Sequence, residues 1–215
     1  MAAFDLPKFQ LSLLSGTYIN HNSAGRGGAI NLSNKTSLKF INQNSMSFNN
    51  AKVVGGAIAS FDSDIIWEEL TTLYLTDNEA DRGSAIYLYR SFLKSSHYDF
   101  LTTVHFLNNK ARIGGTLYWI KDDLMKSALD IKSFKFMNNI APYGITTATQ
   151  ATSVIGPTTY NASNYLKSMT KELNFTAVDY YGKDLVIFPE DLFVLKASIK
   201  DKKYDCSGRI PTISR

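Results

Sequence analysis

Residues 18–30 read YINHNSAGRGGAI, and the same pattern returns further along the chain. Residues 74–86 read YLTDNEADRGSAI, and residues 105–117 read HFLNNKARIGGTL. All three contain an apolar residue, two spacers, Asn, one spacer, Ala, two spacers and Gly, followed by a small residue, Ala or Thr, and an aliphatic residue. Internal similarity of this kind is the sequence signature of a repeat architecture.

Two further copies depart slightly from the pattern. Residues 44–58 contain Asn49 and Ala51 before a Gly-Gly-Ala-Ile run, with one extra residue between the alanine and the glycines. The last copy, at residues 136–144, keeps the apolar residue, Asn, Ala and Gly but loses the second small residue and the aliphatic one. A degenerate final copy is typical of a capping repeat, so the sequence predicts about five coils.

The local pattern decides which repeat fold this is. The anchor alanines are 27, 29, 31 and 30 residues apart, and helical repeats of roughly 33–34 residues are the main rival. Segments such as 37–41 and 102–107 alternate apolar and polar residues with a period of two, which indicates strands. We therefore predict an all-β fold, a right-handed single-stranded parallel β-helix with a period of 27–31 residues.

Coils in such a fold stack about 4.8 Å apart, so equivalent residues form ladders. An asparagine can bond both its own backbone and the amide one coil away, and glycine permits a positive φ or a close backbone approach at a corner. The expected asparagine ladder is Asn22, Asn49, Asn78, Asn109 and Asn139. The expected alanine ladder, at a tight corner, is Ala24, Ala51, Ala80, Ala111 and Ala141. The expected corner glycines are Gly27, Gly28, Gly55, Gly56, Gly83, Gly114, Gly115 and Gly144.

Two short motifs suggest a family. Residues 27–30 and 55–58 read Gly-Gly-Ala-Ile, and residues 106–109 and 136–139 read Phe-x-x-Asn. These motifs resemble the repeats of chlamydial polymorphic outer membrane proteins, and equally the β-helical arrays of large ciliate surface and transmembrane proteins. The resemblance covers roughly residues 15–147. It implies a pectin lyase-like β-helix, display at a cell surface and adhesion.

Composition changes after the repeats. We expect the β-helix over residues 1–147, a linker or cap rich in Thr, Ser and Ala over 148–170, and a small Ig-like or β-hairpin module over 171–215. Within the last segment, residues 173–178 and 184–188 read as strands joined by a turn. A sheet this small is marginal alone, which favours a truncated module.

Many β-helix proteins act on polysaccharides, so carboxylate pairs must be weighed. Asp62 and Asp64 would share a face of a strand, and glycosidases need two carboxyl groups about 5–9.5 Å apart. However, the motifs Asn-Thr-Asp, Asp-Asp and Gly-His-Gly expected together in a pectinase are absent, and adjacent aspartates occur only at residues 122–123. We therefore expect no catalytic residue.

Metal and cofactor chemistry has little support. The three histidines, His21, His97 and His105, lack metal-ligand spacing. Cys206 is the single cysteine, which excludes an intrachain disulfide and a cysteine metal site. The net charge of +4 is spread along the chain without a basic cluster, which argues against nucleic-acid binding. The expectation is no cofactor and no metal.

Location is predicted in two ways. The N-terminal residues do not form a signal peptide, which taken literally predicts a cytoplasmic protein. The resemblance instead predicts a fragment of a larger surface or extracellular protein, anchored by a segment absent here. Four Asn-x-Ser/Thr sequons are candidate glycosylation sites on a secretory route: Asn31, Asn34, Asn161 and Asn174.

Three hypotheses follow. The first is a non-enzymatic surface scaffold that binds a protein or glycan partner through exposed loops, such as residues 60–70, 89–101 and 121–129. The second is a carbohydrate-active β-helix enzyme. The third is an intracellular assembly component whose coil ends stack on further coils. We favour the first.

Overall fold

The computed structural model describes residues 4–7, 10–95, 102–120, 131, 133–155, 176–180, 182, 184, 194–195 and 208–209. The regular structure assigned to these residues is all β. The chain divides into two compact units, residues 1–185 and 186–215. The first unit contains the stacked sheets on which the rest of the structure depends.

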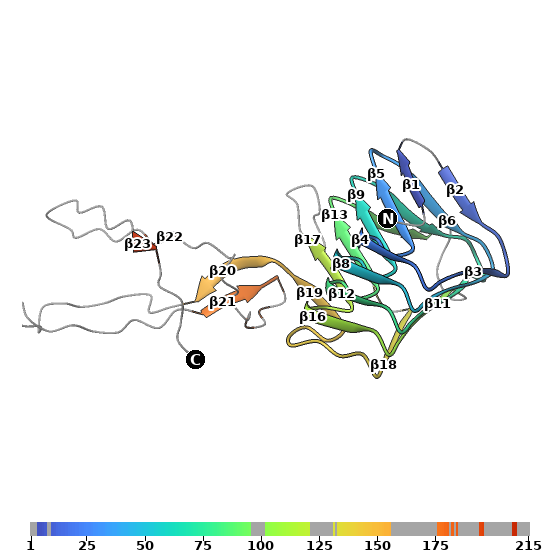
Figure 1. Cartoon of the computed structure of the whole chain (residues 1–215). Helices are drawn as coiled ribbons and strands as arrows, with labels where there is room; N and C mark the ends of the chain where they lie inside the picture. Colours follow the sequence, from blue (N-terminus) through green and yellow to red (C-terminus); the bar gives the residue numbers. More distant parts are fainter. Residues whose placement is uncertain are drawn as a thin grey trace, which may run out of the picture. The chain divides into compact units, whose positions relative to one another are not determined.

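Four parallel sheets form the sides of a β-solenoid, and each complete turn adds one strand to each sheet (Figure 1). Sheet A contains β1 (Phe4–Pro7), β5 (Ile30–Ser33), β9 (Ile58–Phe61), β13 (Ile86–Tyr89), β17 (Leu117–Ile120) and β19 (Thr147–Thr149). Sheet B contains β2 (Gln10–Leu13), β6 (Ser37–Phe40), β10 (Asp64–Trp67) and β14 (Phe92–Ser95). Sheet C contains β3 (Thr17–Asn20), β7 (Gln43–Ser47), β11 (Thr72–Thr76), β15 (Thr103–Leu107) and β18 (Phe134–Met137). Sheet D contains β4 (Ser23–Arg26), β8 (Asn50–Val54), β12 (Glu79–Arg82) and β16 (Lys110–Gly114).

The strand pairing confirms the predicted all-β parallel solenoid. The described residues form four complete turns, β1–β4, β5–β8, β9–β12 and β13–β16. A partial fifth turn supplies β17, β18 and β19, and its sheet D side is reduced to two bridges, Lys110 to Ile140 and Gly114 to Tyr143. This agrees with the expectation of about five coils whose last copy is degenerate.

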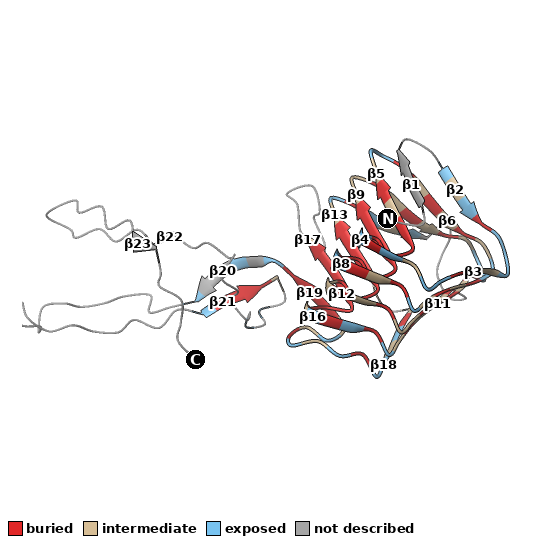
Figure 2. Ribbon diagram, in the orientation of Figure 1, coloured by how far each residue is buried: buried red, intermediate tan, exposed pale blue. Residues whose placement is uncertain are grey.

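The core is a set of apolar ladders inside the solenoid. The apolar position of the repeat pairs directly from coil to coil, in the order Ile19, Met46, Leu75, Phe106 and Phe136. On sheets B and C the strands alternate between buried and half-buried residues, because every second side chain faces inward. Sheet A differs, since β9, β13 and β17 are buried at three of their four residues (Figure 2).

Left-handed residues make the corners. The residue immediately before each ladder asparagine has a positive φ of 54–56°, and these residues are His21, Phe48, Asp77, Asn108 and Asn138. The ladder asparagines themselves have no positive φ, so the tolerance of asparagine for left-handed angles is not what selects it here. At the next corner the positive φ falls on glycine: Gly27, Gly55, Gly83, Gly115 and Gly144. Those glycines accept this backbone without a Cβ penalty.

The segment after sheet A continues into an antiparallel pair. Strand β20 (Ala151–Ile155) pairs with β21 (Thr176–Asp179), although sequence analysis expected a linker or cap at β20. Val178 also bridges Asp184 in antiparallel fashion, and Gly182 between them has a φ of 73°, as a turn there requires. In the second unit, β22 (Val194–Leu195) pairs with β23 (Gly208–Arg209). The rest of the expected Ig-like or hairpin module lies outside the described residues.

The solenoid core is covered at its C-terminal end by Tyr180. Its ring meets Trp119 edge-on, with 5.3 Å between ring centroids, and Trp119 is fully buried. The Tyr180 backbone N–H donates to Thr149 Oγ1 at 2.9 Å. The preceding residues Ala177 and Val178 are also buried. The segment 177–180 therefore caps the last strands of sheet A.

Candidate functional site

The structure brings the five repeat asparagines together in one hydrogen-bonded column. Asn22 Nδ2 donates to Asn49 Oδ1 at 3.1 Å, and Asn49 repeats this contact with Asn78. Asn78 in turn donates to Asn109, and Asn109 donates to Asn139, both at 3.0 Å. The same oxygens also accept the backbone N–H of the preceding asparagine at 2.9–3.1 Å.

Each interior asparagine has all four side-chain hydrogen-bonding positions filled. Besides the contacts along the column, its Nδ2 donates back to the carbonyl of the apolar ladder residue one coil earlier, as Asn78 does to Met46 at 3.0 Å. Asn78 and Asn109 are fully buried. Buried polar groups are tolerated only when satisfied, so the column specifies the register of the coils as well as joining them.

The repeat alanines are largely buried, and the paired glycines beside them leave no room for a side chain. Ala24, Ala51, Ala80 and Ala111 are buried but lie on the short strands of sheet D, not at the corner that sequence analysis expected, and Ala141 is half-buried. In the first two Gly-Gly pairs, the second glycine faces the backbone of the next coil. A methyl group at Gly28 would overlap the carbonyl oxygen of Gly56, and one at Gly56 would overlap that of Ser84.

The fourth coil uses its glycine pair differently. Gly115, not Gly114, takes the left-handed corner with a φ of 70°. Gly114 instead pairs with Arg82 at the end of sheet D, and the ring of Tyr143 lies where its Cβ would be. The register shift in sheet D absorbs such length differences, as it also does for the extra residue after Ala51.

A second polar column, missed by sequence analysis, lies at the corner between sheets A and B. Ser63 and Ser91 occupy equivalent positions, and both are buried. Ser60 Oγ donates to Ser91 Oγ at 3.0 Å, and the Ser63 N–H donates to the same oxygen at 3.2 Å. Aligning the coils would have placed the two serines at one position, which is the signal that could have found them.

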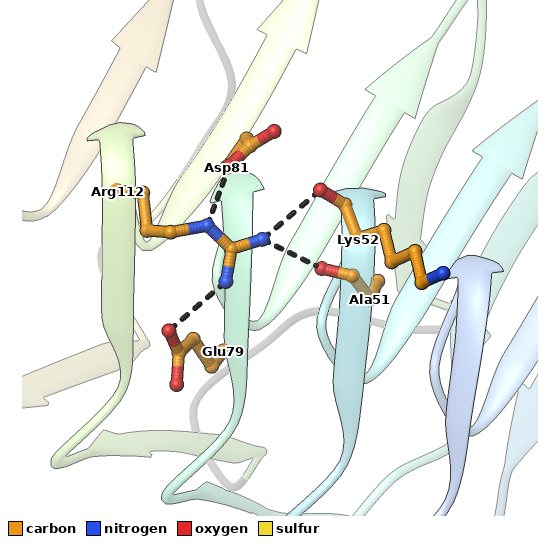
Figure 3. A network of polar contacts seen from close by, with 5 residues as sticks. All are labelled: Ala51, Lys52, Glu79, Asp81 and Arg112. Atoms are coloured by element: carbon orange, nitrogen blue, oxygen red, sulfur yellow. Dashed lines mark hydrogen bonds and ion pairs between the residues drawn. The ribbon is translucent and has the colours of Figure 1, made fainter.

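Arg112 ties three coils together on the outer face of sheet D (Figure 3). Its Nε donates to Asp81 at 2.6 Å and one terminal nitrogen donates to Glu79 at 3.0 Å. The other terminal nitrogen reaches the carbonyl oxygens of Ala51 and Lys52 at 3.2 and 3.0 Å. The hydrogen bond that Arg112 donates to the Asp81 carboxylate raises the pKa of Arg112, so the guanidinium stays charged. Equivalent repeat positions carry Lys52, Asp81 and Arg112, and this alternation of charge is visible in the sequence once the coils are aligned.

The carboxylates considered for catalysis are used in the same way, as ties between coils. Asp62 pairs with Arg90 at 3.0 Å, and Asp64 pairs with Lys94 at 2.5 Å. A further carboxylate, Glu68, pairs in the same way with Lys39 of the preceding coil. No group of three or more His, Cys, Asp or Glu side chains arranged to hold a metal is found where the structure is described. Asp122, Asp123, His97 and Cys206 lie outside the described residues.

The outer face of sheet A carries a second apolar cluster, separate from the core. Its buried members are Val54, Ala59, Tyr87, Tyr118, Tyr143 and Ala148, and its half-buried rim is Phe61, Tyr89, Ile113 and Ile120. We call these ten residues the outer aromatic cluster. The rings of Tyr87 and Tyr118 are stacked with 5.7 Å between centroids. The exposed Arg26 lies over the Phe61 ring, with its guanidinium carbon 5.3 Å from the centroid.

Tyr87 and Tyr143, two of the buried tyrosines of the cluster, stay neutral. Burial raises the pKa of Tyr87 to about 12. Burial, followed by the charge and hydrogen bond of Tyr118, raises the pKa of Tyr143 as well. The Tyr143 hydroxyl donates to the Thr149 carbonyl at 2.9 Å. What remains for a partner is the half-buried rim of Phe61 and Tyr89 with Arg26 beside it, a surface suited to stacking contacts with a sugar ring or an apolar side chain.

Only some of the expected partner loops and glycosylation sequons lie among the described residues. Residues 60–70 are not a loop as expected, because they end β9, turn a corner and form β10, whose Ile65 and Trp67 are buried. The other expected loops lie wholly or partly outside the described residues, as do Asn161 and Asn174. Asn34 is exposed at a left-handed turn, whereas Asn31 is half-buried on β5 with an unsatisfied, buried Oδ1.

No protein-family model, no curated protein and no solved structure matches the chain. The part of the chain that the structure describes contains no helix long and apolar enough to span a membrane.

Proposed function

We propose that this chain is a non-enzymatic scaffold at a cell surface or in the extracellular space. In this proposal the β-solenoid is a rigid support, and the rim of the outer aromatic cluster contacts a protein or glycan partner. The Gly-Gly-Ala-Ile and Phe-x-x-Asn motifs support the surface location through their resemblance to displayed β-helical repeats.

The observation that carries the proposal is the use of the carboxylates. Acid–base chemistry on a glycosidic bond requires two carboxyl groups that face one substrate, one of them able to exchange a proton. Asp62 and Asp64 are each held by a separate cation from the next coil, Arg90 and Lys94. Their side chains therefore serve the stack of coils, as those of Glu79 and Asp81 do with Arg112.

The binding half of the proposal rests on the outer aromatic cluster. Phe61 and Tyr89 are neighbours on adjacent strands, with 6.2 Å between ring centroids, and both are half-buried. Aromatic rings that remain accessible on a rigid sheet lose little conformational entropy when a partner stacks on them. Arg26 beside them adds a positive charge.

The first experiment separates the scaffold from an enzyme. The purified chain is incubated with a panel of neutral and acidic polysaccharides, and new reducing ends or unsaturated products are measured. We expect no turnover above that of heat-denatured protein. Turnover that is lost in Asp64→Asn but kept in Asp81→Asn, a matched change in another ion pair, would contradict the proposal and support the carbohydrate-active alternative.

The second experiment tests location and binding. Antibody labelling of intact cells that express an epitope-tagged copy is expected to match labelling of permeabilised cells. On a glycan array, the Phe61→Ala/Tyr89→Ala variant is expected to lose signal. Tyr74→Ala, which removes a half-buried ring from the outer face of sheet C, serves as the control and keeps the signal. Labelling only after permeabilisation would overturn the surface location.

A further inference from the structure

The outer face of sheet A is apolar in the middle and basic at its borders. Strands β5, β9, β13, β17 and β19 lie side by side in this sheet (Figure 1), and none of them contains a charged residue. The outer aromatic cluster is centred on this face. The charged groups beside the cluster come from residues just before and just after these strands. Their arrangement indicates which kind of partner the cluster binds.

Two arginines line the border with sheet D. Arg26 and Arg82 both pair with Val54, from opposite sides, so they occupy equivalent positions two coils apart. Arg26 is exposed, and its guanidinium carbon lies over the Phe61 ring, 5.3 Å from the centroid. Burial raises the pKa of Tyr87, and the positive charges of Arg82 and Arg26 oppose that rise. Both guanidinium groups therefore act on the cluster, and Arg26 lies over one of its accessible rings.

Two further cations line the border with sheet B. Lys35 and Arg90 follow strands β5 and β13 at corners with a positive φ, and both are exposed. The Arg90 guanidinium carbon is 5.8 Å from the centroid of the Tyr89 ring, and Arg90 Nε pairs with Asp62 at 3.0 Å. Within the residues that the structure describes, no ion pair involves Arg26 or Lys35. The rim therefore has a surplus of positive charge that an anionic partner can reach.

The outer face of sheet A restricts a partner to side-chain contacts. Strands β9 and β13 are paired on both sides, so their backbone groups are bonded within the sheet and cannot accept an added strand. The face instead offers two accessible rings, Phe61 and Tyr89, whose centroids are 6.2 Å apart in adjacent coils. This separation is close to the length of one sugar unit in a polysaccharide, so each ring can stack on its own sugar.

A charged sugar matches this arrangement better than an acidic peptide does. In a sugar acid the carboxylate is bonded to the ring, so the group that stacks and the group that pairs with a cation are held at a fixed separation. Arg26 over Phe61 provides the matching pair on the protein. An Asp or Glu side chain instead carries its carboxylate on a flexible chain that does not stack, so it gains only exposed ion pairs of small value.

We propose that the rim of the outer aromatic cluster binds a glycan whose sugars carry carboxylate groups. Phe61 and Tyr89 stack on successive sugars, and the Arg26 guanidinium binds one carboxylate through two parallel hydrogen bonds. Lys35 adds attraction at longer range. This inference rests on the binding role proposed above, and it narrows the partner from a protein or glycan to an acidic glycan.

The test uses the full chain and two matched ligands, a mannuronate hexasaccharide and the mannose hexasaccharide obtained by reducing its carboxyl groups. Isothermal titration calorimetry measures both affinities at low and at high salt. We expect about tenfold tighter binding of the acidic ligand at low salt, from one bidentate guanidinium–carboxylate pair. At roughly 1 M salt the preference should fall to about twofold, because exposed charges are then screened.

Variants of the protein locate the carboxylate-binding group. Arg26→Gln should bind the two hexasaccharides with affinities that differ by no more than about twofold. Lys135→Gln removes the same charge from an exposed position on β18 of sheet C, and it should keep the full preference. Phe61→Ala/Tyr89→Ala should bind neither ligand, because both stacking rings are gone.

The outcomes separate this inference from the binding role on which it rests. Equal binding of both ligands to the unaltered chain, lost in Phe61→Ala/Tyr89→Ala, would overturn the inference and leave glycan binding intact. Binding of neither ligand would overturn it as well, and the glycan array then decides separately whether another glycan binds. A preference that persists in Arg26→Gln would contradict the proposal. So would equal affinity for a poly-glutamate peptide, which would identify an acidic protein as the partner.

Discussion

Asn78 and Arg112 make an informative pair, because each side chain forms four hydrogen bonds that join neighbouring coils. Asn78 lies in the inner column, fully buried, and bonds Asn49, Met46 and Asn109. Arg112 lies on the outer face of sheet D, and 39% of its side-chain surface remains exposed. The two side chains form the same number of hydrogen bonds, but one is buried and the other is partly exposed to solvent.

This difference leads us to expect that burial, more than the number of hydrogen bonds, decides how much a side chain contributes to the free energy of unfolding. If Arg112 is removed, water replaces it at Asp81 and Glu79, so the net loss is small. If Asn78 is removed, its partners remain buried without hydrogen bonds, and each orphaned group costs about 1–3 kcal/mol. Four substitutions or conditions, ordered by expected effect, test this contrast.

The largest loss of stability is expected where the backbones of adjacent coils leave no room for a side chain. Gly56→Ala places a methyl group on the carbonyl oxygen of Ser84 and within 2.8 Å of the Glu79 backbone. Adjacent coils must then separate, so we expect a loss of about 3–5 kcal/mol or failure to fold. Urea unfolding measures it. Gly25→Ala is the control, since nothing lies within 4 Å of its Cβ, and it should be neutral. Equal losses in the two variants would contradict this packing account.

The second effect is the loss of one rung of the asparagine column. Asn78→Ala should lower the free energy of unfolding by about 3 kcal/mol, because it leaves Asn49 and the Met46 carbonyl unsatisfied in the core. The loss should be the same at low and high salt. Asn22→Ala, at the half-exposed start of the column, should cost about 1 kcal/mol. A larger loss in Asn22→Ala than in Asn78→Ala would show that burial is not the deciding factor.

The third effect is the pH dependence of stability that comes from a buried tyrosine on the outer face of sheet A. Tyr87 has a folded-state pKa of about 12 against 10.0 for the free side chain. A raised pKa means that the stabilisation is complete below pH 10 and is lost as the pH rises towards 12, by about 2 kcal/mol. Unfolding curves between pH 9 and 12 measure the decline (roughly the range in which a phenol titrates). Tyr87→Phe should flatten the decline, and an unchanged slope would count against burial of this ring.

The smallest effect is expected at Arg112. Arg112→Ala should cost at most about 1 kcal/mol, and the loss should shrink as salt is added. Arg112→Lys keeps the charge but loses the fork that reaches Asp81, Glu79 and two carbonyl oxygens, so it should lose most of the same amount. Urea midpoints at two salt concentrations measure both variants. If Arg112→Ala lost as much stability as Asn78→Ala, independently of salt, the expected difference between buried and exposed hydrogen bonds would be wrong.

The sequence predicted well those residues whose spacing is fixed by the way equivalent positions pair from coil to coil. Asn49 and Asn78 stand three residues after an inward apolar residue because the corner allows one spacing only, and the pattern of the repeat records it. Gly27 and Gly55 were predictable for the same reason, since a positive φ at that corner favours glycine. The strand-like alternation of residues 37–41 was likewise found within one residue of the observed β6 (Ser37–Phe40).

What the sequence did not reveal depends on side chains that meet across coils or on strands without a pattern. The strands of sheet D were missed because Gly25 and a register shift disguise them. Strand β2 was missed because its coil precedes the first copy of the motif. The Arg112 network joins residues up to 61 apart in the sequence, and whether it forms depends on side-chain length and reach. The serine column and the outer aromatic cluster likewise appear only when the coils are superposed.

The direct pairing of Ile58 with Ile86 has a consequence for how such a molecule changes over generations. Both residues end near-identical runs, Gly-Gly-Ala-Ile and Gly-Ser-Ala-Ile. A deletion or duplication of residues 59–86 would begin and end at equivalent rungs, so it would remove or add one whole turn and leave the register of the remaining rungs unchanged. A solenoid of this kind can therefore change its length in steps of one complete turn.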